Sequence, residues 1–178
     1  MAINPFSKEL NEVKVIKGKN FKDSRGILKK TIYGDSIKNL MPNPSEVINS
    51  TSKKNVIRGL HYQNPPYQVS KFVTCVHGKI LDVILNIKKD SPYYGFYDSI
   101  ELSEDDDIAI FIPEGYAHGF SVISDIAIVS YLQSGDYNEI YDMSINPLSM
   151  NIDWKIRNPI VSQKDLNAVM FKNLKSEF

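Results

Sequence analysis

Short runs rich in apolar and β-branched residues recur along the chain, and turn-forming residues separate them. The pattern predicts strands at Val13–Ile16, Leu28–Tyr33, Glu46–Ser50, Asn55–Tyr62, Lys71–Val76, Ile80–Ile87, Tyr94–Leu102, Ile108–Pro113, His118–Ser121 and Ile126–Leu132. Many short strands at close spacing are typical of an all-β sandwich or barrel. Helical periodicity is confined to a short turn near Ser36–Leu40 and to a C-terminal stretch from Gln163 to Leu174. In that stretch one apolar face would combine Leu166, Val169, Met170 and Leu174, so we expect helices only at the periphery.

The predicted strand Ile80–Ile87 is apolar on both faces except at Asp82 and Asn86. Residues four apart in a strand point the same way, so these two polar groups face one interior. Two interpretations are open. Both side chains line a polar cavity, or both bond to backbone at the mouth of a closed sheet, because buried polar groups need partners.

Length and charge narrow the classes of function. The 178 residues are 42% hydrophobic, enough for the core of one domain that spans residues 1–178. The 21 basic residues balance 21 acidic ones, so no overall field favours nucleic acid or an anionic membrane. The densest charge run, Glu104-Asp105-Asp106-Asp107, predicts a solvated turn between strands and not a metal site.

Cysteine usage and hydropathy predict the compartment. The single cysteine, Cys75, excludes an intrachain disulfide, and the first residues lack the apolar segment of a secretory signal. No window approaches the roughly 18 consecutive apolar residues that span a bilayer. We therefore expect a soluble cytoplasmic protein with no membrane partner.

The stretch Arg58-Gly59-Leu60-His61-Tyr62-Gln63 carries the strongest candidate chemistry. A histidine between a fixed cation and polar side chains can abstract a proton beside a carbonyl. The alternative is that His61 is an ordinary hydrogen-bonded residue at a strand end.

A second histidine follows a sharp turn. Pro113-Glu114-Gly115-Tyr116-Ala117-His118 has a Pro-x-Gly-x-x-His spacing that resembles the second motif of the cupins, whose histidines often bind metal. A cupin metal site also needs a His-x-His pair and a carboxylate, but the other histidines, His61 and His77, are sixteen residues apart. We expect no metal, and His118 is either a donor to an anion or a structural turn residue.

Taken in order, these segments resemble the nucleotide-sugar 3,5-epimerases, the family of dTDP-4-dehydrorhamnose 3,5-epimerase. The resemblance covers nearly the whole chain. It rests on Phe21-Lys22-Asp23-Ser24-Arg25-Gly26, Asn49-Ser50 through Arg58–Gln63, Lys71, Asp82-Val83, Ser91-Pro92, Pro113–Phe120, Tyr131 with Tyr137, Ile152-Asp153-Trp154 and Ser162–Asp165. It implies a cupin-type double-stranded β-helix, or jelly roll, with a few short peripheral helices.

The resemblance also implies a reaction. The substrate is a nucleotide diphosphate-linked 4-keto sugar, whose C3 and C5 protons flank the carbonyl. Epimerisation through an enolate needs a base, a donor to the oxyanion and an acid on the opposite face. By resemblance these are His61, Lys71 and Tyr131, and neither a metal nor an organic cofactor is required.

The carboxylate that orients His61 has two candidates. The resemblance indicates Asp165, and Asp82 is the alternative. Asp165 follows Ser162 by three positions, so a helix capping box would explain that pair without any chemistry. Lys71 and Tyr131 also have structural alternatives, as a strand lysine at a sheet edge and as a packed tyrosine.

Substrate-binding positions implied by the resemblance are Phe21, Arg25, Asn49, Arg58, Gln63, His118 and Tyr137. Arginine and histidine would neutralise the diphosphate, unless they form surface ion pairs, and Tyr137 would form a wall against the sugar. Family members are typically homodimers that exchange their N-terminal strands. Phe21 and Arg25 are therefore expected to serve the neighbour's pocket.

At two positions that bear on the nucleotide, the chain departs from the family pattern. Thymidine-type enzymes usually carry a glutamate where this chain has Lys30 and a glutamine where it has Val47. An ammonium cannot accept a hydrogen bond from a base N–H, so GDP and a heptose enter as hypotheses. The resemblance also leaves open a single-site 3- or 5-epimerase, a 4-keto-sugar 3,4-ketoisomerase and a non-catalytic sugar-nucleotide-binding module.

Overall fold

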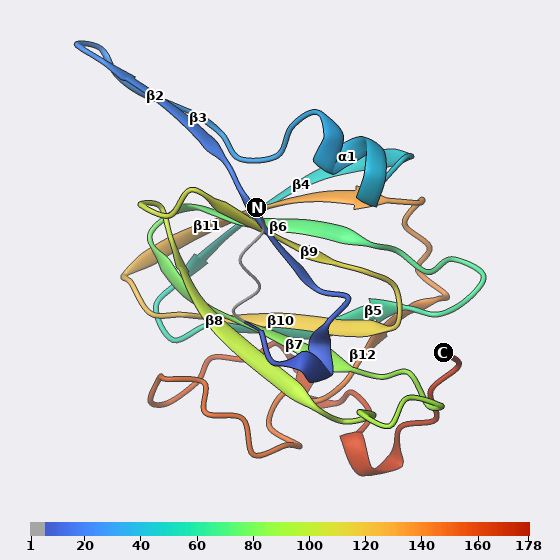
Figure 1. The fold of residues 1–178 in the computed structure, drawn as a ribbon. Coiled ribbons are helices and arrows are strands. Elements are labelled where there is room, and N and C mark those ends of the chain that lie inside the picture. The colour runs from blue at the N-terminus through green and yellow to red at the C-terminus, as the bar shows by residue number, and fades with distance from the viewer. Residues whose placement is uncertain (1–5) are drawn as a thin grey trace.

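Two five-stranded antiparallel sheets form the body of the molecule, in a computed structural model that describes residues 6–178 (Figure 1). The first sheet has the order β1 (Lys14–Lys17), β9 (Ile108–Ile112), β6 (Lys71–His77), β11 (Ile126–Ser134) and β4 (Pro44–Lys53). The second has the order β12 (Asp142–Ser144), β5 (Ile57–Gln63), β10 (Tyr116–Val122), β7 (Lys79–Asn86) and β8 (Tyr97–Ser103). The all-β jelly-roll prediction is confirmed.

The strand β7 is buried on both faces, as its apolar sequence predicts. Ile80 and Ile84 point into the core between the sheets, where they join residues of β6, β9 and β11. The alternate residues Leu81, Val83 and Leu85 belong to a second cluster on the other side of the sheet. An interior strand buried on both sides fixes the position of β10 beside it and, through β10, that of β5.

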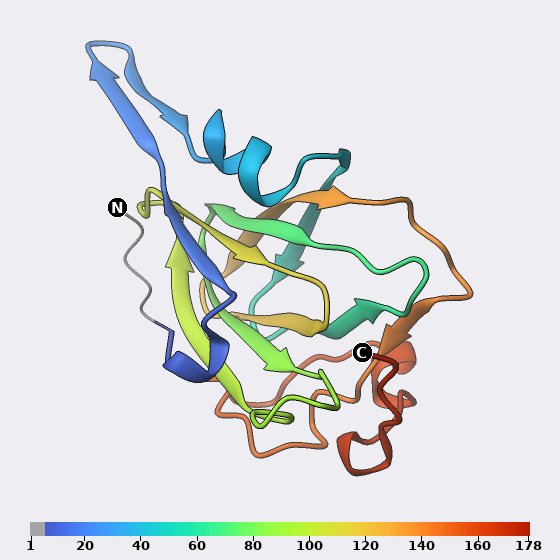
Figure 2. The ribbon, with the colours of Figure 1, turned by 45° about the vertical axis from the view of Figure 1, so that its right-hand side comes forward.

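Peripheral segments cover the outer faces of both sheets. The helix α1 (Asp35–Leu40) lies beside the first sheet, where Met41 packs with Phe72 and Phe111. The chain after β12 runs along the outer face of the second sheet, as Figures 1 and 2 show, and contributes Ile152 and Trp154 to that cluster. The helices are peripheral, as predicted.

A hairpin of β2 (Lys19–Asp23) and β3 (Gly26–Lys30) projects away from the body (Figures 1 and 2). The sequence predicted only one strand here, at Leu28–Tyr33, and missed β2. All ten hairpin positions are exposed, so no apolar alternation marks them. The turn has a local cause, because Asp23 Oδ1 accepts a 2.8 Å hydrogen bond from the Arg25 amide.

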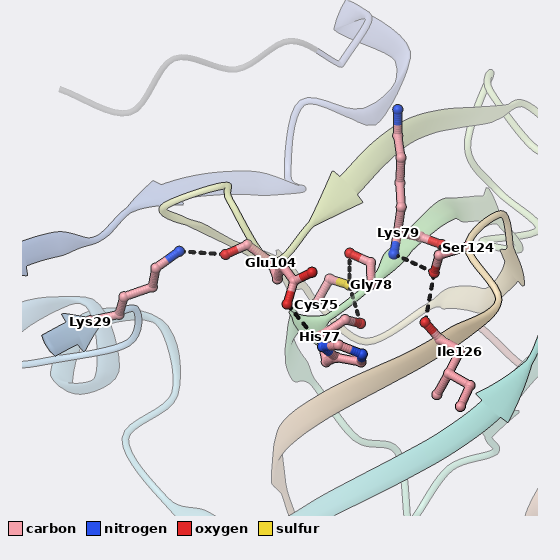
Figure 3. Close-up of polar contacts among 8 residues, drawn as sticks. All are labelled: Lys29, Cys75, His77, Gly78, Lys79, Glu104, Ser124 and Ile126. Carbon is pink, nitrogen blue, oxygen red and sulfur yellow. Dashed lines mark hydrogen bonds and ion pairs between the residues drawn. The ribbon is translucent and has the colours of Figure 1, made fainter. Parts of the chain in front are cut away.

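The acidic run forms the turn between β8 and β9, as predicted. Asp106 accepts hydrogen bonds from the amide and the hydroxyl of Ser103, at 2.7 and 2.9 Å. Lys29 of β3 donates to the Glu104 carbonyl, and the Glu104 carboxylate lies 2.9 Å from Nδ1 of His77 (Figure 3). The run therefore fastens the base of the hairpin to the body and engages the third histidine of the chain.

The long C-terminal helix predicted from Gln163 to Leu174 is wrong. The helix α2 (Gln163–Leu166) ends after one turn, and a 3₁₀ turn, η2 (Phe171–Asn173), follows. Asn146 donates from Nδ2 to the Leu166 carbonyl at 2.7 Å and from its amide to the Val169 carbonyl at 3.0 Å. These bonds from Asn146 take the place of the backbone hydrogen bonds that would continue the helix.

Other element boundaries differ by a few residues. The predicted strand at Tyr94–Leu102 begins only at Tyr97, because the preceding residues form turns. The short elements η1 (Lys8–Leu10) and β12 have no sequence pattern of their own and were not predicted. Within residues 6–178, no helix is long and apolar enough to cross a membrane.

Candidate active site

A cavity of about 240 Å³ lies between the two sheets and receives side chains from both. Its lining residues are Ile48, Ser50, Arg58, His61, Tyr62, Gln63, Val69, Lys71, His118, Tyr131, Gln133, Tyr137 and Asp142. Seven of the eleven predicted site residues are in this set. The other four are not in the lining. Asp165 bonds to His61 from outside it, whereas Phe21, Arg25 and Asn49 have no part in it.

Two glycines bring the histidine-bearing strands together. Gly59 of β5 has a φ of +115°, and a Cβ there would lie 2.5 Å from the Cα of Gly119 on β10. A Cβ on Gly119 would lie 2.6 Å from the Arg58 carbonyl. Only residues without a side chain allow this approach, which pairs His61 with His118 across the two strands.

His61 is paired with Asp165. Its Nε2 lies 2.7 Å from Asp165 Oδ1, and its side chain is 38% exposed. A carboxylate only accepts hydrogen bonds, so Nε2 carries the proton and Nδ1 is the nitrogen free to take another. The structure therefore selects Asp165 over Asp82 as the partner of His61.

The Asp165 carboxylate also caps its own helix. Its amide donates to Ser162 Oγ at 3.1 Å, and Ser162 Oγ donates back to Asp165 Oδ2 at 2.9 Å. Burial acts to raise the pKa of Asp165, but hydrogen bonds from His61 and Ser162 and the charge of His61 hold it below the usual value. The capping interpretation and the orienting interpretation are thus compatible, because one carboxylate serves both contacts.

Asp82 pairs with the other histidine. His118 Nε2 lies 2.6 Å from Asp82 Oδ1, and both side chains are buried. His118 sits within β10 and not at its start, so the turn-residue interpretation is wrong. Asn86 does not line the cavity, because its side chain bonds to Ser91 Oγ and to the Lys88 amide at the end of β7.

Lys71 is a buried cation on a central strand, so it does not protect a sheet edge. Only 8% of it is exposed, and desolvation lowers the pKa of its ammonium to about 8, while the charges of Asp142 and Asp82 act in the opposite direction. On the adjacent strand β11, burial and the charge of Asp82 raise the pKa of Tyr131 above its usual value. The Tyr131 ring meets the His118 ring edge-on, with centroids 5.9 Å apart.

Strand alternation places Asn49 outside the cavity of a single chain. Ile48 and Ser50 of β4 face the cavity, so Asn49 between them points away and is exposed. Val47 points outward too and is 69% exposed. The role of Asn49 in substrate binding therefore stays a prediction, and Ile48 lines the cavity in its place.

Two other predicted residues lie on the projecting hairpin. Phe21 and Arg25 line a shallow hollow formed entirely by β2, β3 and their turn. The Arg25 side chain is 88% exposed and paired with Asp23 at 2.5 Å. Within one chain, neither residue reaches the cavity that holds His61.

Sequence reasoning missed six cavity residues: Ile48, Ser50, Tyr62, Val69, Gln133 and Asp142. Alternation along β11 could have identified Gln133, which lies two residues after Tyr131. No pattern marks Asp142, because its strand has only three residues. Across residues 6–178, no cluster of three or more His, Cys, Asp or Glu side chains could hold a metal ion.

Comparisons with known proteins identify the family. The model of the dTDP-4-dehydrorhamnose 3,5-epimerase family matches residues 7–173. The Shigella flexneri enzyme of that name is 35% identical over 174 residues, 95% of this chain and 96% of that one. A Sulfolobus tokodaii structure of that name is 32% identical, with a TM-score of 0.89 and coverage of 99% and 97%.

A second solved structure was determined with a ligand. The Legionella pneumophila epimerase in complex with dTDP-4-keto-L-rhamnose is 29% identical, with a TM-score of 0.88, and the match covers 98% of this chain and 94% of that one. The architecture of these relatives confirms the cupin-type fold. On the family model and these relatives together, the chain belongs to the dTDP-4-dehydrorhamnose 3,5-epimerase family.

Proposed function

We propose that the protein is an isomerase that inverts C3, C5 or both in a nucleotide-linked 4-keto sugar, without a cofactor. One observation carries the proposal. The same cavity is lined by His61, which is bonded to Asp165, by the buried Lys71 and by Tyr131. These are the base, the oxyanion donor and the acid that epimerisation through an enolate requires.

His61 is the base. Its Nδ1 takes the proton next to the carbonyl, and the Asp165 carboxylate on Nε2 stabilises the imidazolium that forms. A positioned base of this kind contributes roughly 10²–10⁴ in rate. The partly exposed ring lets the abstracted proton exchange with solvent.

Lys71 stabilises the enolate. Its ammonium is already stripped of water in the free protein, so it interacts strongly with an oxyanion that develops on the C4 oxygen. Losing one such donor costs roughly 3–4 kcal/mol of transition-state stabilisation.

Tyr131 is the acid. It stands on β11 of the first sheet, whereas His61 stands on β5 of the second, so a sugar held between the sheets meets the two groups from opposite sides. Reprotonation from the opposite side inverts the carbon. This arrangement favours an epimerase over a 3,4-ketoisomerase, which moves protons between carbons without inversion.

Arg58 and His118 bind the diphosphate, and Tyr137 contacts the sugar at the cavity mouth. The guanidinium of Arg58 is steadied by a 2.8 Å hydrogen bond from Nε to Ser52 Oγ. We take dTDP as the nucleotide, because the relatives act on or bind dTDP-linked sugars. The GDP hypothesis rests on Lys30 and Val47, both of which lie outside the cavity of a single chain.

Solvent deuterium tests the function. With a dTDP-linked 4-keto-6-deoxyhexose in D₂O, a mass gain of two with inversion is expected for a 3,5-epimerase, and a gain of one for a single-site enzyme. His61→Asn should abolish exchange while the circular dichroism spectrum and the melting temperature stay close to wild type. Exchange that is unchanged in His61→Asn refutes the assignment of the base. Intact binding with no exchange in the wild type indicates a non-catalytic binding module.

We further propose a homodimer in which the β2–β3 hairpin serves the neighbour's cavity. Three apolar side chains on the hairpin are more than half exposed: Phe21 at 53%, Ile27 at 53% and Leu28 at 61%. These side chains belong to none of the core clusters of the body, and a hairpin that leaves them exposed fits a second copy of the chain. A Phe21→Glu/Leu28→Glu variant should then elute as a monomer in light-scattering chromatography. The control Leu148→Glu, at a site 48% exposed on the C-terminal segment, should stay dimeric.

The protein is expected to act in the cytoplasm as a single domain and to supply sugars for polysaccharide biosynthesis. Its one cysteine, Cys75, is buried and free, which fits a reducing compartment. Fractionation of cells that express the tagged protein checks the location.

A further inference from the structure

We propose that Gln63 is a positioning residue that holds the Tyr137 loop against the cavity and does not itself bind the substrate. The proposal rests on the proposed function, because it assigns Tyr137 to the sugar nucleotide. Gln63 ends β5, two residues after the base His61, and is only 4% exposed. It was predicted as a direct binding residue.

The Gln63 amide is occupied by backbone groups. Its Nε2 donates to the Tyr67 carbonyl at 2.8 Å and to the Asp136 carbonyl at 3.2 Å. Its Oε1 accepts from the Asn138 amide at 2.7 Å. A side-chain amide has two N–H donors, so a substrate oxygen could be bound by Nε2 only if one of these loop contacts were broken.

Two of those contacts flank Tyr137 directly, at residues 136 and 138. The amide of Tyr137 itself donates to Glu46 Oε1 at 3.2 Å, and Ser45 Oγ bonds to the Gly135 carbonyl. Tyr137 is 55% exposed as a residue. Backbone anchors, and not burial of the ring, therefore set the position of this ring at the cavity wall.

Gln63 also ties a second loop to the first. The Tyr67 carbonyl belongs to residues 64–70 between β5 and β6, and that loop contributes Val69 to the cavity. The Tyr67 ring lies 4.8 Å from the ring of Tyr141, centroid to centroid, at the far end of the Tyr137 loop. One buried amide thus joins both loops of the cavity rim to the strand that carries the base.

Gln63→Met tests this role, because it keeps the length of the side chain and removes all three hydrogen bonds. Affinity falls with the fraction of molecules whose loop is in place, so we expect the Kd for dTDP-glucose, which carries a sugar but no reactive ketone, to rise about tenfold. KM for a dTDP-linked 4-keto-6-deoxyhexose should rise similarly, with kcat changed less. In a Tyr137→Ala background the same substitution should add almost nothing, since both changes act through one ring.

A second measurement needs no ligand. In the free protein, Gln63→Met should speed hydrogen exchange of the Asn138 amide at least tenfold, because that amide loses its acceptor. The matched control is Asn86→Leu. Asn86 is 2% exposed and bonds a turn at the end of β7 outside the cavity, so its loss should lower the melting temperature without altering the Kd for dTDP-glucose or Asn138 exchange.

Each failure has a distinct meaning. Unchanged Asn138 exchange in Gln63→Met overturns the positioning role, whatever the protein binds. A tenfold loss of dTDP-glucose affinity that persists in full in the Tyr137→Ala background also overturns it, because Gln63 would then contact the ligand directly. Wild-type protein that binds no dTDP-glucose while Asn138 exchange responds as expected counts against the proposed function and leaves the anchoring of the loop supported.

Discussion

His118 donates from Nε2 to Asp82 Oδ1 over 2.6 Å, and neither side chain is more than 3% exposed. One strand away, His61 forms a similar bond to Asp165 but is 38% exposed. Both histidines line the cavity, and both carboxylates lie outside its lining, but the two pairs are in different environments. The pair of His118 is almost fully buried, whereas the ring of His61 is open to a substrate.

Loss of the carboxylate charge should lower stability in the Asp82 pair and activity in the Asp165 pair. Asp82→Asn leaves His118 with a poorer buried partner and should cost about 3 kcal/mol of unfolding free energy. Asp165→Asn keeps a side chain that can still bond Ser162, so stability should change little, while the wrong histidine tautomer lowers kcat by roughly 10²–10⁴. Urea unfolding and steady-state kinetics on both variants check this. A larger stability loss in Asp165→Asn would contradict it.

Tyr131→Phe should separate proton removal from inversion. His61 can still form the enolate and return a proton to the face it came from, so deuterium exchange at the carbon continues with retained configuration. Inversion should fall by roughly 10²–10⁴, because the acid on the other face is gone. Mass spectrometry measures exchange, and NMR coupling constants of the sugar measure inversion. Equal losses of exchange and inversion would exclude Tyr131 as the acid.

Lys71 should make activity and stability respond to pH in opposite directions. Its pKa is about 8 in the folded protein, below the ordinary lysine value, so kcat/KM should fall as pH rises through about 8. Between pH 8 and roughly 10.5 the unfolded chain binds more protons than the folded one, so unfolding free energy should rise with pH in this window.

Comparison with Lys71→Met isolates the contribution of Lys71 to the pH dependence of stability. It should be inactive yet more stable than wild type at pH 7, by about 3 kcal/mol from the pKa difference. The gap in stability should close as pH approaches roughly 10.5, where the lysine is neutral in the folded state and at its midpoint in the unfolded state. Denaturant titrations of both proteins at three pH values measure it. A gap that does not depend on pH would show that Lys71 carries no buried charge.

The sequence predicted the strands that pack on their own body, because each buried face leaves an alternating or continuous apolar pattern. It missed β2, whose five residues are all exposed. It also extended α2 too far, because the bonds from Asn146 that end the helix come from about 20 residues earlier in the chain. Patterns within a short window report burial well and distant hydrogen bonds poorly.

In the candidate site, too, local patterns were predicted well and distant contacts were not. His61 follows from its local motif, but its partner Asp165 is 104 positions away, and no spacing rule connects them. Only the family resemblance indicated that pair. In β4 the cavity is lined by Ile48 and not by the predicted Asn49, because a shift of one residue moves a side chain to the opposite face of the sheet.

Gly59→Ala should disrupt the site by pushing the backbones of β5 and β10 apart. A methyl group there would lie 2.5 Å from Gly119 Cα and 2.6 Å from the His118 carbonyl, so β5 and β10 must separate. The positive φ adds strain of its own. Together these should cost about 3 kcal/mol and also lower kcat, because separation shifts His61 relative to His118.

Gly34→Ala separates the effect of backbone strain from that of close contact with a neighbouring strand. Gly34 also has a positive φ, +54°, but nothing lies within 4 Å of a Cβ placed there. That variant should lose only about 1 kcal/mol from backbone strain and keep full activity. Thermal unfolding and kcat for both variants provide the comparison. Equal losses would mean that the contact between the two strands can relax, and that the glycine pair is not what holds the two histidines in register.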